Sequence, residues 1–234
     1  MSMAKPEDFQ QEVDTLSADF GKMKLDRSAA LPVMVRYFKR LDADISHFSS
    51  ALACKAGCSY CCNYHVYISV PEAFALAGFL EAKLDPLKKQ NVIARIDANV
   101  LATKSMTLDE HIATNVRCAF LSDAGQCLAY DVRPGACHRH HALDATPCKV
   151  TFENTQSKME ILQNVDLKMI ADGYIQAASF VQQNMKLDAS NYELHGAVKE
   201  ALSNKASLKR WREDKIAFPS VVDRVSPLNL SPQN

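Results

Sequence analysis

The chain has 234 residues, of which 47% are apolar and 23% charged, a composition typical of a folded globular protein rather than a disordered one. The 27 Lys and Arg residues balance the 27 Asp and Glu residues, so no net field draws in nucleic acid or an anionic membrane. Only 7 residues are glycine, which disfavours a β-barrel or a glycine-rich nucleotide site, whereas 8 are cysteine.

The first residues, MSMAKPEDFQ, are polar and lack the apolar core of a signal peptide. Apolar stretches such as residues 73–80 are far shorter than the roughly 20 residues of a membrane helix. We therefore expect a cytoplasmic protein whose thiols stay reduced. In that setting clustered cysteines are more typical of metal or redox sites than of a disulfide framework.

Apolar periodicity predicts amphipathic helices through most of the chain. Residues 31–52 carry apolar side chains at steps of three and four, and further helices are expected to begin at Pro71 and after Asp85–Pro86. Two segments fit the capping box of a helix start, residues 107–110 and residues 190–193. The periodicity resumes after the last cysteine, from Met159 onward.

Two segments are predicted to be extended instead. Residues 66–70 alternate apolar and polar side chains, which is typical of a short strand. Residues 118–130 contain the turn-forming sequence SDAGQ between two apolar runs, which predicts a hairpin. The expected fold class is therefore mainly α: a helical bundle-like body with a small irregular cysteine-rich metal-binding patch and a short β-hairpin. We expect a single helical domain over residues 1–217 and a loose C-terminal tail over residues 218–234.

All the cysteines lie between residues 54 and 148, in two groups, whereas scattered structural cysteines would rarely cluster in this way. The C-x₃-C-x₂-C-C spacing of the first group brings sulfurs together on one helix face or in a loop, and Gly57 favours the loop. The predicted metal ligands are Cys54, Cys58, Cys61 and Cys62 of the first group and Cys118, Cys127, Cys137 and Cys148 of the second.

The adjacent pair Cys61–Cys62 bears on the number of sites. Neighbouring side chains point to opposite faces of extended backbone, so one mononuclear site would rarely use both. Either the pair serves two metals or one thiol is not a ligand. Eight thiols divide into two four-sulfur sites, and we favour a double or polynuclear site.

The second group is followed by histidines, in the order Cys137-His138-Arg139-His140-His141. On a helical turn, His140 and His141 would share the face of Cys137. A solvated polar turn explains the same residues, so their role as ligands stays open.

Other polar residues near the thiols give weaker signals. His65 is a weak ligand candidate. Three histidines on predicted helices, with no partner expected nearby, are interpreted as structural or surface residues: His47, His111 and His195. Four basic residues flank the thiols and could donate hydrogen bonds to them, although ordinary surface charge explains them as well: Arg117, Arg133, Arg139 and Lys149.

The segment CKAGCSYCC, followed by VYISVPEA and then by CAFLSDAGQCLAYDVRPGAC, resembles the YkgJ-like cysteine-cluster family with its zinc- or iron-chelating CxxCxxCC domain. The first gap has three residues in place of two, and His138 stands where the family usually has arginine. One branch of the family resembles flagellin lysine N-methylases, which are associated with an iron–sulfur cluster. The resemblance implies metal chelation by Cys54, Cys58, Cys61, Cys62, Cys118, Cys127 and Cys137.

The predicted function is therefore a metal-binding protein that chelates zinc or iron through a cysteine cluster. The alternative is an iron–sulfur protein with a methylase-like or electron-transfer role. A radical S-adenosylmethionine enzyme would need an α/β barrel, which the pattern does not predict. An adaptor with a zinc module has one basic–aromatic segment in its favour, residues 209–212. No catalytic motif is found, and we expect metal ions as partners rather than nucleic acid or membrane.

Overall fold

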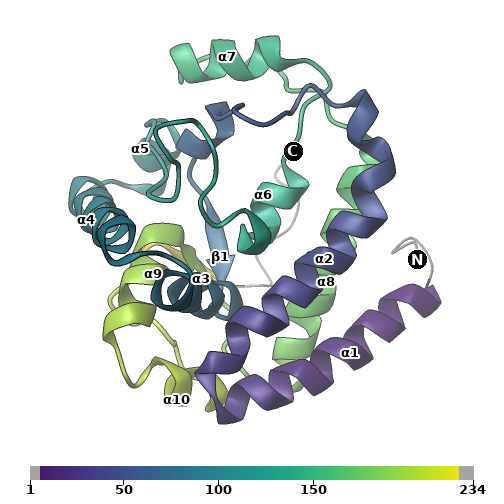
Figure 1. The fold of residues 1–234 in the computed structure, drawn as a ribbon, viewed down its shortest axis with the longest axis vertical. Coiled ribbons are helices and arrows are strands. Elements are labelled where there is room, and N and C mark those ends of the chain that lie inside the picture. Colours follow the sequence, from purple (N-terminus) through teal and green to yellow (C-terminus); the bar gives the residue numbers. More distant parts are fainter. Residues whose placement is uncertain (1–5, 227–234) are drawn as a thin grey trace.

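The computed structural model describes residues 6–226, and this part of the chain is mainly helical (Figure 1). The fold class predicted from the sequence is confirmed. The helices are α1 (Pro6–Leu25), α2 (Ala30–Ile45), α3 (Val70–Ala82), α4 (Pro86–Thr103), α5 (Leu108–Ile112), α6 (Gly135–Arg139), α7 (Ala145–Glu153), α8 (Val165–Asn184), α9 (Leu194–Ser203) and α10 (Ser207–Arg212).

A small antiparallel sheet joins distant parts of the chain. Its strands are β1 (Tyr67–Ser69), β2 (Asn191–Glu193) and β3 (Arg224–Val225), paired in that order. Ile68 lies opposite Tyr192, and both side chains are fully buried. The strand predicted over residues 66–70 is thus confirmed as β1, and its β2 partner was not predicted.

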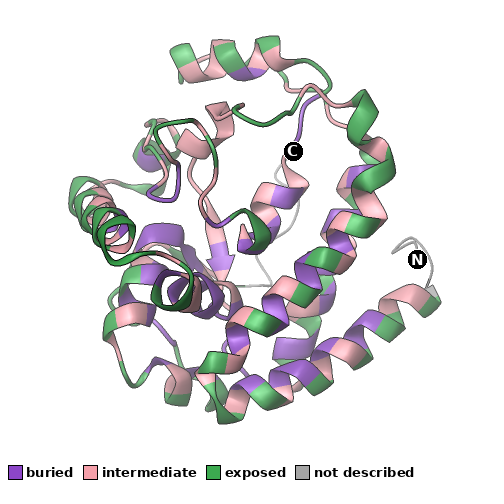
Figure 2. Cartoon of the chain, in the orientation of Figure 1, coloured by how far each residue is buried: buried purple, intermediate pink, exposed green. Residues whose placement is uncertain are grey.

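The core lies where the inner faces of α1, α2, α3, α8 and α9 meet, while α4 exposes most of its residues (Figure 2). Trp211 of α10 is fully buried, packs edge-on against Phe20 and Phe74, and donates from Nε1 to Gln182 Oε1 at 3.3 Å. Burying an aromatic ring of this size stabilises the fold by several kcal/mol, roughly 3–5 by the cost of truncating it to alanine. The aromatic residue of segment 209–212 is therefore part of the core and is not exposed to stack on a base.

The capping boxes give one correct and one wrong prediction. At α5 the Thr107 and Glu110 side chains satisfy each other's backbone N–H groups, as expected. Residues 191–193 of the second segment instead form β2, which pairs with β1, and the Glu193 carboxylate caps α9 by accepting from the N–H groups of His195 and Gly196. A further box, at α3, uses Ser69 and Glu72.

The remaining differences concern where elements end. The helix predicted over residues 31–52 stops at Ile45 and continues as a 3₁₀ turn over Ser46–Ala51. Helix α1 was not predicted, and residues 159–164 precede α8 rather than belonging to a helix. The tail expected to be loose from residue 218 is packed as far as β3, because Phe218 is fully buried and lies edge-on to Tyr192. Residues 1–5 and 227–234, with the rest of the tail prediction, lie outside the described residues.

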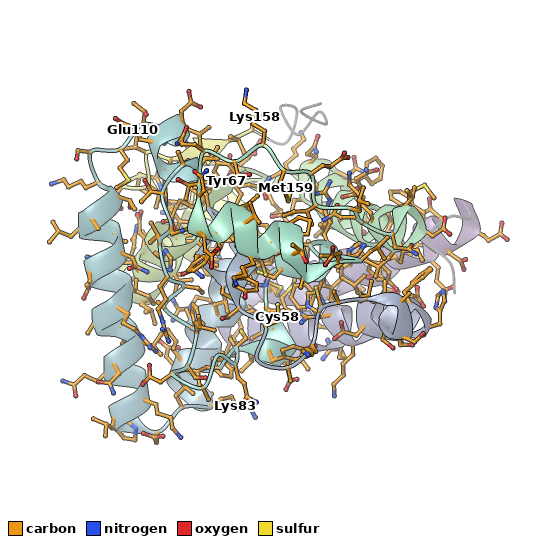
Figure 3. The ribbon with its side chains drawn as sticks, turned by 90° about the horizontal axis from the view of Figure 1, so that it is seen from above. Cys58, Tyr67, Lys83, Glu110, Lys158 and Met159 are labelled. Carbon is orange, nitrogen blue, oxygen red and sulfur yellow. The ribbon has the colours of Figure 1, made fainter. Side chains whose placement is uncertain are left out.

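The element arrangement places α6 in the interior, between α2 and α8 on one side and β1 on the other (Figure 1). Helix α7 lies at one end of the molecule, over the loops that carry the cysteines. Figure 3, the view from above, shows Cys58 near the middle, beside the ribbon of α7. Among residues 6–226 there is no helix with the length and apolar character needed to cross a membrane.

Candidate metal centre

Backbone hydrogen bonds hold the two cysteine segments together. The Cys118 N–H donates to the Cys62 carbonyl at 2.8 Å, and the Val116 N–H donates to the Asn63 carbonyl at 3.0 Å. At the other end of the first segment, the Ala53 N–H donates to the Ala142 carbonyl at 2.9 Å. The first segment is therefore fixed at both ends to the second, although more than fifty residues separate them in sequence.

The two segments enclose a cavity of about 790 Å³. Cys148, buried on α7, lies outside its lining. Every cysteine is a free thiol, so disulfides do not explain the clustering. The thiols that line the cavity are Cys54, Cys58, Cys61, Cys62, Cys118, Cys127 and Cys137.

The first segment is a loop that ends in a 3₁₀ turn over Tyr60–Asn63, so the loop conformation expected from Gly57 is the one adopted. Gly57 has φ +88° and Gly125 has φ +73°, in the left-handed region that favours glycine. A Cβ on Gly125 would lie 3.1 Å from the Gly57 carbonyl oxygen. The two glycines thus allow the cysteine loop and the turn at 122–126 to approach closely.

The predicted hairpin places the next two thiols. Leu121 and Cys127 form an antiparallel bridge, the Ser122 N–H donates to the Gln126 carbonyl at 2.8 Å, and the Leu128 N–H to the Phe120 carbonyl at 2.8 Å. Two short apolar runs folded back on each other bring Cys118 and Cys127 to the same cavity.

Helix α6 places Cys137 at the inner end of the cavity. The Gly135 N–H donates to Glu72 Oε1 at 2.7 Å, while the other carboxylate oxygen, Oε2, accepts from the backbone and the hydroxyl of Ser69. A side chain on Gly135 would come within 3.0 Å of Ile175. One carboxylate therefore caps α3 and anchors α6, which fixes the position of the Cys137 backbone.

The thiols affect one another's ionisation in two sets. Burial raises the pKa of Cys137, and the next contributions come from Cys118, Cys127 and Cys62; we call these four the inner thiols. Burial also raises the pKa of Cys148, followed by effects of Cys54 and Cys58; we call these three the outer thiols.

Cys61 lies between the two sets. Its hydrogen bond to Cys62 lowers the pKa of Cys62 to about 7 and raises the pKa of Cys61. The nearby thiols of Cys137 and Cys54 raise the pKa of Cys61 further. The adjacent pair therefore lies next to members of both sets.

Two of the flanking basic residues act on the thiols. The Arg133 guanidinium, 4.1 Å from the Tyr130 ring centroid, lowers the pKa of several thiols, Cys127 among them, although burial outweighs it there. Arg117 donates to the Ser122 carbonyl at 2.8 Å and also lowers the pKa of Cys62. Positive charge at these two positions favours thiolates. Arg139 instead pairs with Asp172, and Lys149 with Glu153.

His138 has the environment of a metal-ligating histidine. Its Nδ1 lies 2.9 Å from Asp42 Oδ1, and the Phe38 ring stacks on the imidazole at 4.6 Å. The opposite nitrogen, Nε2, is buried without a hydrogen-bond partner, and the residue lines the cavity. Arg133 Nε also lies 3.3 Å from this Nδ1, and burial lowers the pKa of His138.

The other two histidines of this segment differ. His140 also lines the cavity and has a buried Nε2 without a partner. His141 uses both nitrogens, Nδ1 with the Arg139 carbonyl at 2.9 Å and Nε2 as acceptor from the Asn164 N–H at 2.8 Å. His141 is therefore a structural residue, and α6 ends before the turn that would have aligned it with Cys137.

Two histidines predicted to lack partners have them. His195 is buried, its Nε2 accepting from the Ala119 N–H at 3.2 Å and its Nδ1 lying 2.9 Å from Glu193, so it is structural and supports the residue next to Cys118. His111 is buried 3.4 Å from Asp223, which is also bonded to His65. His47 is exposed, as expected. The sequence could not show these pairings because the partners lie far away along the chain.

The distances between candidate ligand atoms can be compared with the distances around a single zinc ion. Four thiolates at 2.3 Å from one tetrahedral zinc lie about 3.8 Å from each other. Within residues 6–226, the one set of three metal-ligand atoms all within 4.8 Å of each other is that of His65, His111 and Asp223. No three thiol sulfurs of the described residues lie this close together, although Cys61 and Cys62 are hydrogen-bonded to each other.

The fold and the cavity together define a helical protein with a thiol-lined pocket of metal-binding character. Residues 53–165 match the family model CxxCxxCC, described as a putative zinc- or iron-chelating domain. This matched segment, just under half of the chain, contains all the cavity-lining thiols. No curated protein and no solved structure matches the chain.

Proposed function

We propose that the protein binds zinc or iron through the thiolates that line its cavity. The observation that carries this proposal is the Cys62–Cys118 backbone hydrogen bond, which brings the cysteines of two distant segments around one pocket. Thiolate ligands select zinc, copper(I) or iron–sulfur groups over magnesium or calcium. The matching family is described as zinc- or iron-chelating, which favours zinc and iron over copper(I) as the bound metal.

The arrangement supports a double or polynuclear centre. Around the cavity the inner thiols supply four sulfurs and Cys54, Cys58 and Cys61 supply three more, while Cys148 lies outside the lining. His138 and His140, each with a buried and unpartnered Nε2, are available as nitrogen ligands. Bound metal would cross-link the cysteine loop, the hairpin and α6 through metal–thiolate bonds. Structural zinc contributes about 10–16 kcal/mol of apparent binding energy in small domains, enough to dominate the folding of such irregular segments.

A second candidate is an iron–sulfur cluster, for which the thiols that line the cavity supply enough ligands. Clusters of the [2Fe–2S] and [4Fe–4S] kinds are each held by four cysteine thiolates. When bound, such a cluster supplies electron-transfer chemistry. The chain's part would be to hold the thiolates and to place the Arg133 charge beside them.

Anaerobic purification followed by elemental analysis and an absorption spectrum tests the proposal. Zinc or iron is expected in stoichiometric amount, with visible absorption and acid-labile sulfide if the group is an iron–sulfur cluster. Cys58→Ser and Cys61→Ser should each lower the metal per chain, and His47→Ala, at an exposed histidine, should not. Colourless protein with stoichiometric zinc would eliminate the cluster, and protein without either metal would overturn the proposal itself.

A further inference from the structure

A second cluster of metal-ligand groups lies apart from the thiols. His65 follows the cysteine loop, His111 lies on α5, and Asp223 directly precedes β3. His65 Nε2 is 2.9 Å and His111 Nδ1 is 3.4 Å from the same oxygen, Asp223 Oδ2. The three atoms all lie within 4.8 Å of one another, and the two imidazole rings are perpendicular with centroids 4.6 Å apart.

From this geometry we infer that His65, His111 and Asp223 form a binding site for a divalent transition metal, iron(II) or zinc(II), separate from the thiol centre. Two imidazoles and one carboxylate are the donor set of mononuclear iron(II) sites, and zinc accepts the same donors. Three protein ligands leave at least one coordination position open. Both histidines line the same cavity as the cysteines, so that position faces a space large enough for a further ligand.

The surroundings hold these ligands in place. The Tyr67 hydroxyl donates to Asp223 Oδ1 at 2.6 Å, which orients the carboxylate so that Oδ2 points to the two imidazoles. The Glu193 N–H donates to the Asp223 carbonyl at 2.9 Å and ties this residue to β2. A hydrogen bond to the second oxygen of a ligating carboxylate is typical of metal sites, where it fixes the ligand and raises affinity.

Burial and charge also favour a cation. The side chains of His65 and His111 are 6% and 5% exposed, whereas that of Asp223 is 27% exposed. The set has a net charge of minus one when both imidazoles are neutral, so a divalent cation would be partly neutralised within it. Each imidazole would bind in the tautomer with its proton on the other nitrogen, and the hydrogen bonds to Asp223 Oδ2 would be replaced by metal bonds.

Anaerobic titration of the metal-free full chain with cobalt(II) tests the inference, because cobalt substitutes for zinc and reports its ligands. Thiolate ligands give intense near-ultraviolet charge-transfer bands, whereas histidine and carboxylate ligands give weak visible bands alone. His111→Ala and Asp223→Asn are each expected to remove one cobalt per chain and to leave the thiolate bands unchanged. His47→Ala, at an exposed histidine, is the matched control and should change neither.

The two centres are separable in this experiment. Cys137→Ser is expected to weaken the thiolate bands while the cobalt held by His65, His111 and Asp223 remains. A proton NMR spectrum of the unmodified cobalt protein covers the case in which a variant fails to fold. It should show strongly shifted N–H resonances from two coordinated imidazoles that persist in Cys137→Ser, which separates them from any histidine ligand of the thiol centre. A cobalt stoichiometry unchanged in both His111→Ala and Asp223→Asn, or the absence of the shifted resonances, would overturn the site and leave a hydrogen-bonded His–Asp–His cluster.

Discussion

The backbone N–H of Cys118 donates to the carbonyl of Cys62 at 2.8 Å, and this bond links a loop cysteine to one at the start of the hairpin. Because the bond involves the main chain, it does not depend on a metal to draw the two thiols together. The protein fold thus supplies a frame in which distant cysteines already surround one cavity.

The contact between Gly57 and Gly125 should be sensitive to a single methyl group. Gly125→Ala puts a Cβ 3.1 Å from the Gly57 oxygen at a residue with φ +73°. A left-handed alanine costs roughly 1–2 kcal/mol, and the cysteine loop would be displaced as well. We expect lower stability in urea and weaker metal retention. Gly21→Ala, in α1 with nothing within 4 Å of the added Cβ, should be neutral or stabilising; equal effects of the two changes would refute the close contact.

Single cysteine changes should separate the two sets of thiols. Cys137 lies among the inner thiols, so Cys137→Ser is expected to remove or weaken the metal bound there. Cys148 interacts with Cys54 and Cys58, so Cys148→Ser should affect only metal held by the outer thiols. Metal per chain, measured by elemental analysis after desalting, distinguishes the two. Loss of all metal in Cys148→Ser would contradict the division into sets.

The Asp42–His138 pair predicts an effect of a residue that does not touch metal. Asp42→Asn removes the carboxylate that lies 2.9 Å from His138 Nδ1, so the ring loses a contact that orients it. Changes of this kind lower metal affinity about 10–100-fold. Competition with a chromophoric chelator measures the shift. Asp172→Asn, at a carboxylate paired with Arg139, is the control; if both variants retained the affinity of the unmodified protein, His138 would be removed from the candidate ligands.

Glu72 should matter more for stability than an ordinary capping residue. Glu72→Gln replaces one of two acceptor oxygens with an amide that cannot accept from Ser69 or Gly135. We expect a loss of about 1–3 kcal/mol in the free energy of unfolding, because a buried N–H group is left without a partner. Glu110→Gln changes the exposed box of α5 and should cost about 1 kcal/mol or less. Urea denaturation compares them, and equal losses would argue against the anchoring of α6 by Glu72.

The sequence predicted those elements whose cause is local. The apolar period of α3, the proline at the start of α4 and the Thr107–Glu110 box all act within a few residues. The 190–193 box failed because Tyr192 pairs with Ile68, a contact more than 120 residues away along the chain. The spacing of residues 190–193 is typical of a capping box, but strand pairing with a distant segment determined the structure there.

For the site, too, the sequence indicated the residues with a local pattern and not those whose partners are distant in sequence. Cysteine spacing pointed to the cavity-lining thiols because sulfur ligands have few other reasons to cluster. The roles of His111 and His138 could not be predicted, since their partners, Asp223 and Asp42, come from distant segments. The only local signal was His65, three residues after Cys62, and it does not distinguish a thiol centre from a separate histidine site.

The most direct test of a shared centre is X-ray absorption at the metal edge of anaerobically purified protein, comparing the unmodified chain with Cys62→Ser and Cys118→Ser. The account predicts a shell of sulfur neighbours at about 2.3 Å, with fewer sulfurs per metal, or less metal per chain, in each variant. A sulfur shell and metal content unchanged by the loss of either cysteine, or metal bound without sulfur neighbours, would contradict it.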